Sequence, residues 1–317
     1  MKLWLTAATR TATQVDHLIF ALLLISLAVL LLVFGLMLLY MFKYRAGSDI
    51  DRGTVAKKTW RVETAWTAAT LAAFLGLFIW GARLYVELYQ PPRDALRIYV
   101  VGKQFMWKVE HDGGQREINA IHLPVGIDIQ LIMTSEDVIH DFSVPAFRIK
   151  HDVLPGRYET LWFRVEKPGT YHLFCTQLCG VDHASMIGEI VALPKTEYQQ
   201  WLARNGAGES LAAAGKTLFM RYGCSGCHGS DGAGGNQSQS TVRAPSLVGL
   251  YGSTVTLNDG SLVKADDRYI RDCILTPARQ RVASYLPVMP SFAGEMSEED
   301  LLKIISYLKT LGAGVTP

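Results

Sequence analysis

The chain opens with two long apolar stretches, and no comparable stretch follows them. Residues 18–42 hold 25 residues without a charged side chain, and residues 64–82 form a second uncharged run of 19. As helices they would measure about 37 Å and about 28 Å, which suits a hydrocarbon layer of ~30 Å. The first run is too long for the apolar core of a cleaved signal peptide, which spans about 7–15 residues. The pattern predicts two retained transmembrane helices within residues 1–92.

The segment between these two runs is short and basic. Three acidic residues, Asp49, Asp51 and Glu63, stand against six basic ones: Lys43, Arg45, Arg52, Lys57, Lys58 and Arg61. The positive-inside rule places such a loop in the cytoplasm. The two helices then form a hairpin whose ends both face outward, and everything after Arg93 lies outside the cytoplasm.

Residues 93–195 change to the period of a β-strand. Ile127, Ile129, Leu131 and Met133 alternate along GIDIQLIM and would share one face of a strand. Further strand candidates are LRIYVVG, RYETLWFRV and GTYHLF, and glycine- or proline-containing turn signals separate them. Short strands at this spacing predict an all-β sandwich or barrel.

The last part of the chain has the period of helices. Residues 196–209 end in small and polar residues and are interpreted as a linker. In residues 210–317, Ser210 and Ser297 each stand where a helix N-cap is expected. An apolar stripe follows the second cap at helical spacing, formed by Leu301, Ile304, Ile305, Leu308 and Leu311. The pattern predicts a helical domain with a Gly/Ser/Gln-rich loop over residues 229–240.

This helical domain carries the motif CSGCH. Cys224, Cys227 and His228 match C-x-x-C-H, the signature of c-type haem attachment, in which both cysteines bind the haem and the histidine binds iron. A zinc knuckle is the alternative, and the helical surroundings argue against it. Met289, in the proline-flanked stretch YLPVMPSF, is the candidate for the second iron ligand, whereas Met296 stands beside a helix cap. A His/Met pair raises the iron potential, as electron-transfer cytochromes require.

A second motif, CTQLCGVDHASM, concentrates metal ligands in one loop of the β domain. The loop supplies Cys175, Cys179, His183 and Met186, and His140 lies after an upstream strand. A disulfide between the two cysteines is the simpler interpretation, and an outward-facing domain would permit one. Two thiolates, two imidazoles and a thioether are a soft set that favours copper over zinc, magnesium or calcium. Since a blue-copper site needs only one cysteine, two cysteines indicate two copper ions bridged by both thiolates.

With both motifs in place, the chain resembles subunit II of the haem–copper cytochrome c oxidases, in the caa type that carries a cytochrome c domain at its C-terminus. The resemblance spans nearly the whole chain. The family's dinuclear CuA motif falls on His140, Cys175, Cys179, His183 and Met186, and the family also uses the backbone carbonyl at the position of Gln177.

The resemblance implies a fold for each part of a multi-domain membrane protein. Residues 1–92 would form the two-helix transmembrane hairpin, and residues 93–195 an all-β cupredoxin Greek-key barrel that holds CuA. Residues 196–209 would be the linker, and residues 210–317 an all-α class I cytochrome c domain with covalent haem c.

Three further positions gain a meaning from the resemblance. Glu63 matches the glutamate at the cytoplasmic mouth of the family's K proton channel. Trp107 is retained in GKQFMW as a candidate for the electron path, whereas Phe105 stands where the family usually has the tryptophan that accepts electrons from soluble cytochrome c. Gln177 replaces a glutamate whose carboxylate also binds magnesium at the interface with subunit I. Because a neutral amide is a poorer ligand for a hard cation, the magnesium site becomes doubtful.

The implied function is that of the electron-input subunit of a proton-pumping terminal oxidase. Electrons would pass from an external donor, a cytochrome or a respiratory complex, to haem c, then to CuA, then to subunit I, which reduces O2 to water. Subunits I and III and the membrane are the expected partners. The copper and haem domains would lie on the periplasmic side of a bacterial cytoplasmic (inner) membrane. The formal net charge of +2 gives no reason to expect a nucleic-acid partner.

Oxygen chemistry is not expected in this chain itself, because neither predicted membrane span contains a histidine to bind a catalytic metal. Two alternatives remain open: the CuA subunit of a nitric oxide reductase, and a membrane-anchored electron-transfer protein without an enzymatic partner.

Overall fold

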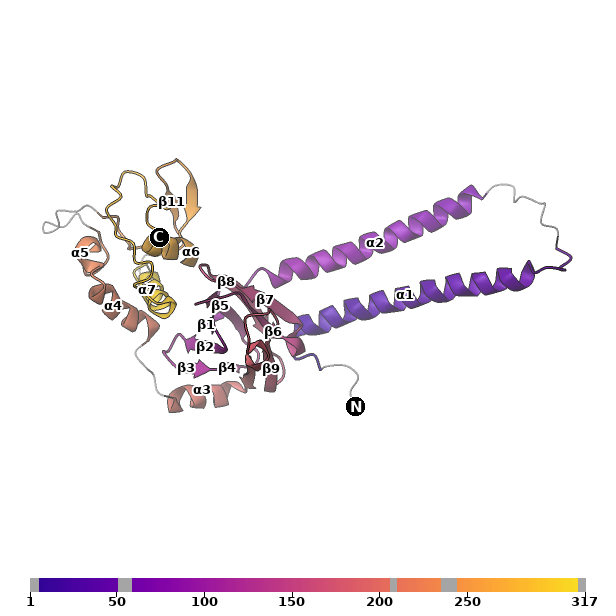
Figure 1. The fold of residues 1–317 in the computed structure, drawn as a ribbon, viewed down its shortest axis with the longest axis horizontal. Helices are drawn as coiled ribbons and strands as arrows, with labels where there is room; N and C mark the ends of the chain where they lie inside the picture. Colours follow the sequence, from indigo (N-terminus) through magenta and orange to yellow (C-terminus); the bar gives the residue numbers. More distant parts are fainter. Residues whose placement is uncertain (1–5, 51–58, 206–209, 235–243, 313–317) are drawn as a thin grey trace.

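The computed structural model describes residues 6–50, 59–205, 210–234 and 244–312. Figure 1 shows a long helical hairpin, a β domain at its open end, and a helical C-terminal domain beside the β domain. Part of the basic loop (51–58), part of the predicted linker (206–209) and part of the Gly/Ser/Gln-rich loop (235–243) lie outside the described residues.

The hairpin consists of α1 (Arg10–Lys43) and α2 (Trp60–Leu88). Both helices are long and apolar enough to cross a membrane, which agrees with the predicted spans. Each helix extends beyond its uncharged run. Thr9 caps α1 by accepting a hydrogen bond from the backbone N–H of Ala12, so the helix begins early enough to include Asp16 and His17.

The β domain is built from two five-stranded sheets. The first has the order β3-β2-β1-β5-β8 and the second β4-β10-β9-β6-β7. Only the β1–β5 and β4–β10 pairs are parallel among the described strand pairs. The strands are β1 (Leu96–Lys103), β2 (Met106–His111), β3 (Arg116–Ile118), β4 (Ala120–Pro124), β5 (Asp128–Ser135), β6 (His140–Val144), β7 (Ile149–Val153), β8 (Glu159–Arg164), β9 (Gly169–Cys175) and β10 (Ile187–Leu193).

The inner faces of these two sheets form one apolar core, as the period-two pattern predicts. Ile129, Leu131 and Met133 of β5 are fully buried in it, together with Trp107 and Phe142. Two short 3-10 helices, η1 (Pro145–Phe147) and η2 (His183–Ser185), interrupt the connections between strands. This architecture is the cupredoxin-type sandwich expected for residues 93–195.

The linker prediction was wrong for most of its length. Residues 195–204 form helix α3 (Lys195–Arg204), which packs on the β domain. Tyr198 is buried against His111, and the Trp201 ring stacks on His122 with centroids 4.6 Å apart. The small and polar residues that suggested a linker come after this helix, whereas its two aromatic residues supply an apolar face that needs a partner.

The C-terminal domain is helical, as predicted, with one addition. Its helices are α4 (Leu211–Arg221), α5 (Ser225–His228), α6 (Asp267–Leu275) and α7 (Glu298–Thr310), and Ser210 and Ser297 cap α4 and α7 through their hydroxyl groups. A short hairpin of β11 (Thr254–Thr256) and β12 (Leu262–Lys264) was not expected in an all-α domain. Gly260, at φ +84°, supplies the left-handed turn conformation that this hairpin requires.

A buried ion pair fixes the hairpin to the β domain. Arg148 donates from Nε and Nη2 to both carboxylate oxygens of Asp16 at 2.8 and 3.0 Å, and little of either side chain is exposed. A bidentate ion pair also constrains the relative orientation of the two groups that form it. It therefore sets the angle at which α1 leaves the β domain.

We expect Asp16→Ala to lower the free energy of unfolding by roughly 1–3 kcal/mol, because it removes charge-assisted hydrogen bonds from a poorly solvated site. The control is Asp128→Ala, which removes the bidentate partner of Arg164 at the surface of the same domain, where Arg164 is 49% exposed. That change should cost less than about 1 kcal/mol. Chemical unfolding of the full chain in detergent measures both, and equal losses would contradict the prediction.

Candidate metal centre and cofactor cavity

The pairing of β6 with β9 brings the two halves of the predicted metal site together. His140 is the first residue of β6 and Cys175 is the last residue of β9, and in the antiparallel ladder Cys175 stands opposite Phe142. The loop after β9 then turns back so that Cys179, His183 and Met186 face the same point. All the sequence-predicted soft donors therefore come from one end of the second sheet.

The donor atoms lie at short and similar separations. The Sγ atoms of Cys175 and Cys179 are 3.8 Å apart. Cys175 Sγ is 3.9 Å from Nδ1 of His140, and Cys179 Sγ is 3.4 Å from Nδ1 of His183. The thioether of Met186 is 3.9 Å from Cys179 Sγ. The ligand atoms of His140, Cys175 and Cys179 lie within 4.8 Å of one another, and all three residues are buried.

These separations suit metal ligands better than a disulfide. Disulfide sulfurs are ~2.05 Å apart, whereas both cysteines are free thiols here. Two ligand atoms at roughly 2.0–2.3 Å from one tetrahedral metal ion lie about 3.3–3.8 Å apart, close to the distances observed. Each sulfur has its own imidazole, and the sulfurs share the space between them, so the cluster fits two soft ions bridged by two thiolates.

The backbone of the cysteine loop adds a further donor. The Cys175 thiol lies 3.3 Å from the carbonyl oxygen of Gln177, the atom that the resemblance assigns to metal binding. Gln104 donates from its side-chain amide to the carbonyl of Cys179 at 2.5 Å and so holds the other end of the loop.

Asp137 is a positioning residue that sequence reasoning missed. Its carboxylate accepts from the backbone N–H of Gln104 and contacts Nε2 of His140 at 2.8 Å, which leaves Nδ1 facing the sulfur. Carboxylates that orient ligating histidines in this way are common around metal sites. The only sequence signal was an aspartate three residues before the histidine.

The pKa values of the two thiols in the cluster shift in opposite directions. Burial raises the pKa of both thiols, but hydrogen bonds with His140 and with the backbone lower that of Cys175 to about 7. Burial and the neighbouring Cys175 raise the pKa of Cys179 to about 11. Burial alone would lower the pKa of His140, but its bonds to Cys175 and Asp137 raise it. Bound cations would be needed to hold both sulfurs as thiolates at neutral pH.

Trp107 lies directly beside this cluster. It is fully buried, and its ring meets those of His140 and Phe142 edge-on, with centroids 5.9 and 5.4 Å apart. Gly102 lies against the same histidine: a Cβ atom there would come within 2.8 Å of Cδ2 of His140. Phe105 is half-buried at the edge of the core. The tertiary fold therefore places Trp107, the predicted electron-path residue, in contact with a predicted copper ligand.

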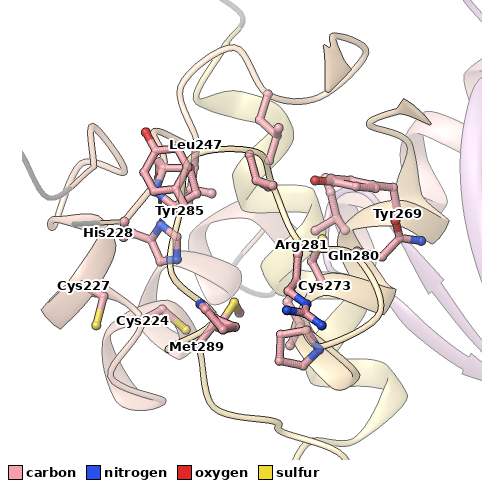
Figure 2. Close-up of a pocket in the computed structure, with 18 of the residues that line it drawn as sticks. Cys224, Cys227, His228, Leu247, Tyr269, Cys273, Gln280, Arg281, Tyr285 and Met289 are labelled. Carbon is pink, nitrogen blue, oxygen red and sulfur yellow. Dashed lines mark hydrogen bonds between the residues drawn. The ribbon is translucent and has the colours of Figure 1, made fainter. Parts of the chain in front are cut away.

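A cavity of about 970 Å³ opens in the C-terminal domain, lined mostly by apolar side chains. Figure 2 shows Cys224, Cys227, His228 and Met289 around one part of it, with Arg281 toward the other. The volume and the apolar lining suit a haem, and guanidinium groups of Arg279 and Arg281 in the lining suit its carboxylates.

His228 is held for metal binding. Its Nδ1 donates to the carbonyl of Pro245 at 3.0 Å, which leaves Nε2 available for iron. Burial lowers the pKa of His228, so the neutral imidazole is favoured. The close contact gives Pro245 a defined place beside the haem motif.

The second predicted iron ligand also reaches the cavity. Met289 is part of the lining, whereas Met296 is buried in the apolar core and is not among the lining residues that the structure describes. Met220 is partly exposed on α4. The geometry therefore favours Met289 over Met296 as the second ligand, and Met220 does not line the described cavity either.

Glu63 lies far from both sites. It is exposed in the first turn of α2, at the end of the hairpin opposite the β domain (Figure 1).

Comparison with known proteins gives matches for both extramembrane domains. Residues 99–192 match the family profile described as cytochrome c oxidase subunit II, periplasmic domain, and residues 212–312 match the one described as cytochrome c. The chain is similar to cytochrome c oxidase subunit 2 of Alkalihalophilus pseudofirmus, with 27% identity over 310 residues that cover 93% of this chain and 86% of that protein.

Two further similar proteins match a part of this chain. Heme-copper oxidase subunit 2 of Aeropyrum pernix is 30% identical over 177 residues, which cover 50% of this chain and 75% of that protein. The crystal structure of the periplasmic domain of subunit II of cytochrome oxidase of Bradyrhizobium japonicum is 31% identical, covers 37% of this chain and 96% of that chain, and has a TM-score of 0.35. With matches in both domains and relatives along most of its length, the chain belongs to the subunit II family of haem–copper cytochrome c oxidases and carries a fused cytochrome c domain.

Proposed function

We propose that this subunit is the electron input of a proton-pumping terminal oxidase. Electrons pass from an external donor, a cytochrome or a respiratory complex, through haem c and dinuclear CuA to subunit I, where O2 is reduced to water. One observation carries the proposal: a cluster of two cysteines, two histidines and a methionine, all buried except the half-buried His183, lies in the same chain as an apolar cavity that bears Cys224, Cys227 and His228.

The copper-binding residues have distinct parts in this proposal. Cys175 and Cys179 would supply the shared thiolates, His140 and His183 would each bind through Nδ1, and the Met186 thioether and Gln177 carbonyl would complete the set. Bound copper would supply a one-electron carrier. The protein contributes rigidity, because Asp137 and Trp107 fix His140, and it contributes burial, which excludes water.

The haem-binding residues likewise have separate roles in this proposal. Cys224 and Cys227 would attach the haem covalently, and His228, held by the Pro245 carbonyl, and Met289 would bind it from the cavity walls. Haem c supplies a one-electron carrier whose potential the His/Met pair raises.

The remaining assignments concern the assembly. Subunit I supplies the oxygen chemistry, subunit III completes the complex, and Glu63 marks a proton entrance on the cytoplasmic side. The copper and haem domains face the periplasm of a bacterium, with the hairpin in the inner membrane.

The test is a redox difference spectrum of the purified complex, together with oxygen uptake and proton release. We expect a c-type haem band, a near-infrared band of mixed-valence copper, and oxygen uptake coupled to proton release. A complex that reduces nitric oxide but not oxygen, or a chain that purifies with both centres and without a catalytic partner, would overturn the proposal.

Bound copper should depend on both cysteines. Because each thiolate is shared by two ions, Cys175→Ser and Cys179→Ser should each abolish the near-infrared band and remove most of the copper, measured by absorbance and by elemental analysis. Cys273→Ser, which removes a free thiol from the other domain, is the control and should retain both. A variant of either bridging position that still holds two copper ions per chain would refute the shared bridge.

Replacement of Met289 should change the haem, and replacement of Met296 should not. Met289→Ala removes a thioether from the cavity wall, so we expect a mainly high-spin haem with a lowered potential. Met296→Ala removes a buried core side chain and should lower stability while the haem spectrum stays normal. Optical spectra and a redox titration of each complex decide, and the reverse outcome would reassign the ligand.

Gln177 should decide magnesium retention without changing copper. Copper binding uses its backbone carbonyl, so Gln177→Glu should leave the near-infrared band unchanged, whereas the new carboxylate should improve binding of a hard cation. Manganese, used as a paramagnetic substitute, is measured by EPR, with Gln177→Asn as the control. Equal manganese occupancy in all three forms would contradict the prediction.

A further inference from the structure

Strand β1 is buried on both faces, although it belongs to the first sheet of a two-sheet sandwich. Ile98 and Val100 point into the core of the β domain, whereas Tyr99 and Val101 belong to the apolar core of the C-terminal domain. Ile132 of β5 and Tyr158 join that second core. One sheet face of such a sandwich usually meets solvent, so this outer face has acquired a partner.

The partner is helix α7. Its sequence is amphipathic, with an apolar stripe and a polar face, yet all residues from Leu301 to Leu308 are buried. The buried set includes Lys303 and Ser306, which lie off the stripe. Ser306 Oγ donates to the Tyr99 hydroxyl at 3.3 Å, and Lys303 Nζ is 3.9 Å from a Glu110 carboxylate oxygen. Both sides of the helix are therefore covered, one by its own domain and one by the β domain.

Charges on the two domains also match across this contact. Lys108 of β2 bonds Glu136 of its own domain at 3.0 Å and Glu299 of α7 at 2.9 Å. At the other end, Arg271 donates to the backbone carbonyl of Gly156 at 2.5 Å while it pairs with Glu298. The Arg271 side chain is almost fully buried, so its position depends on the contact between the two domains.

The same two elements join the cofactor cavity to the metal cluster. Ile304 and Leu308 of α7 line the cavity, and α7 contacts β1. The next residue of β1 after Val101 is Gly102, which lies against His140 and pairs with Trp107 of β2. A continuous protein connection therefore runs from the cavity wall through α7 and β1 to a copper ligand.

We propose that the outer face of β1, β5 and Tyr158 is a permanent docking surface for the haem domain, and that electrons cross the β1–α7 contact without release of the domain. In each event the haem domain loses one electron and the copper domain gains one, and no bond is made or broken. This inference rests on the proposed function, and it adds a fixed position for the haem domain.

The experiment uses the purified full-length complex. Lys108→Glu places a third carboxylate beside Glu136 and Glu299 and should open the contact, while Lys108→Glu/Glu299→Lys should restore it. Ser306→Trp overfills the buried contact with Tyr99 from a position outside the described cavity lining. The matched control is Lys103→Glu, since Lys103 pairs with the same Glu136 at 3.1 Å but is half exposed and has no described ion pair with α7.

Two readouts are taken on each variant. Hydroxyl-radical footprinting reports the exposure of Tyr99 and Tyr158, and flash photoreduction of the haem followed in the near-infrared reports electron transfer to copper. We expect both tyrosines to be protected in the wild type, the charge-swapped double variant and the Lys103 control. In the two opening variants they should react, and transfer should slow at least tenfold.

The outcomes separate this inference from the function it rests on. Loss of the haem or copper band in the wild type would defeat the proposed function. If both bands are present, either of two results would overturn fixed docking alone. One is that Tyr99 and Tyr158 react in the wild type. The other is that a variant with reactive tyrosines still transfers electrons at the wild-type rate. A variant whose tyrosines stay protected should keep the wild-type rate, and slow transfer there would also contradict the inference.

Discussion

The antiparallel pairing of β6 with β9 is the interaction on which the metal centre depends. It sets His140 beside Cys175, although 34 residues separate them in the chain. Every residue of β6 is buried, so its register is held by the core as well as by backbone hydrogen bonds. A slip of one residue would turn Cys175 to the opposite face and separate the two halves of the donor set.

Several residues around this strand pair hold the metal-ligand side chains in position. Asp137 holds His140 by one nitrogen, Trp107 packs on its ring, and Gly102 leaves room for it. Gln104 secures the carbonyl of Cys179. These contacts hold the donors in place, which is the arrangement that keeps geometry constant when an electron is gained or lost.

Strand β1 links the two halves of the extramembrane part. It contributes to the β-domain core with one face and to the C-terminal core with the other. The C-terminal domain therefore packs against the β domain and also contains the cofactor cavity. The contact combines apolar burial with charges such as Lys108 and Glu299, a composition common where domains of one chain meet.

Many features of this protein can be predicted from its sequence, because the patterns that indicate them are local. Uncharged runs of sufficient length predict the hairpin, period-two alternation predicts β5, and C-x-x-C-H names the haem motif within five residues. The crowding of Cys175, Cys179, His183 and Met186 in one loop likewise indicates a soft metal site. Residues this close in sequence must also lie close together in space.

Tertiary structure alone decided what depends on distant partners. The role of Gln104 appears only when segments far apart in sequence meet, because its partners Asp137 and Cys179 are 33 and 75 residues away. Helix α3 shows the same limit: Tyr198 and Trp201 looked like linker residues until His111 and His122 were found beneath them. The docking face follows this rule in part: Tyr99, Val101 and Ile132 make its outward positions apolar in the sequence, but only the packing shows that the C-terminal domain covers them.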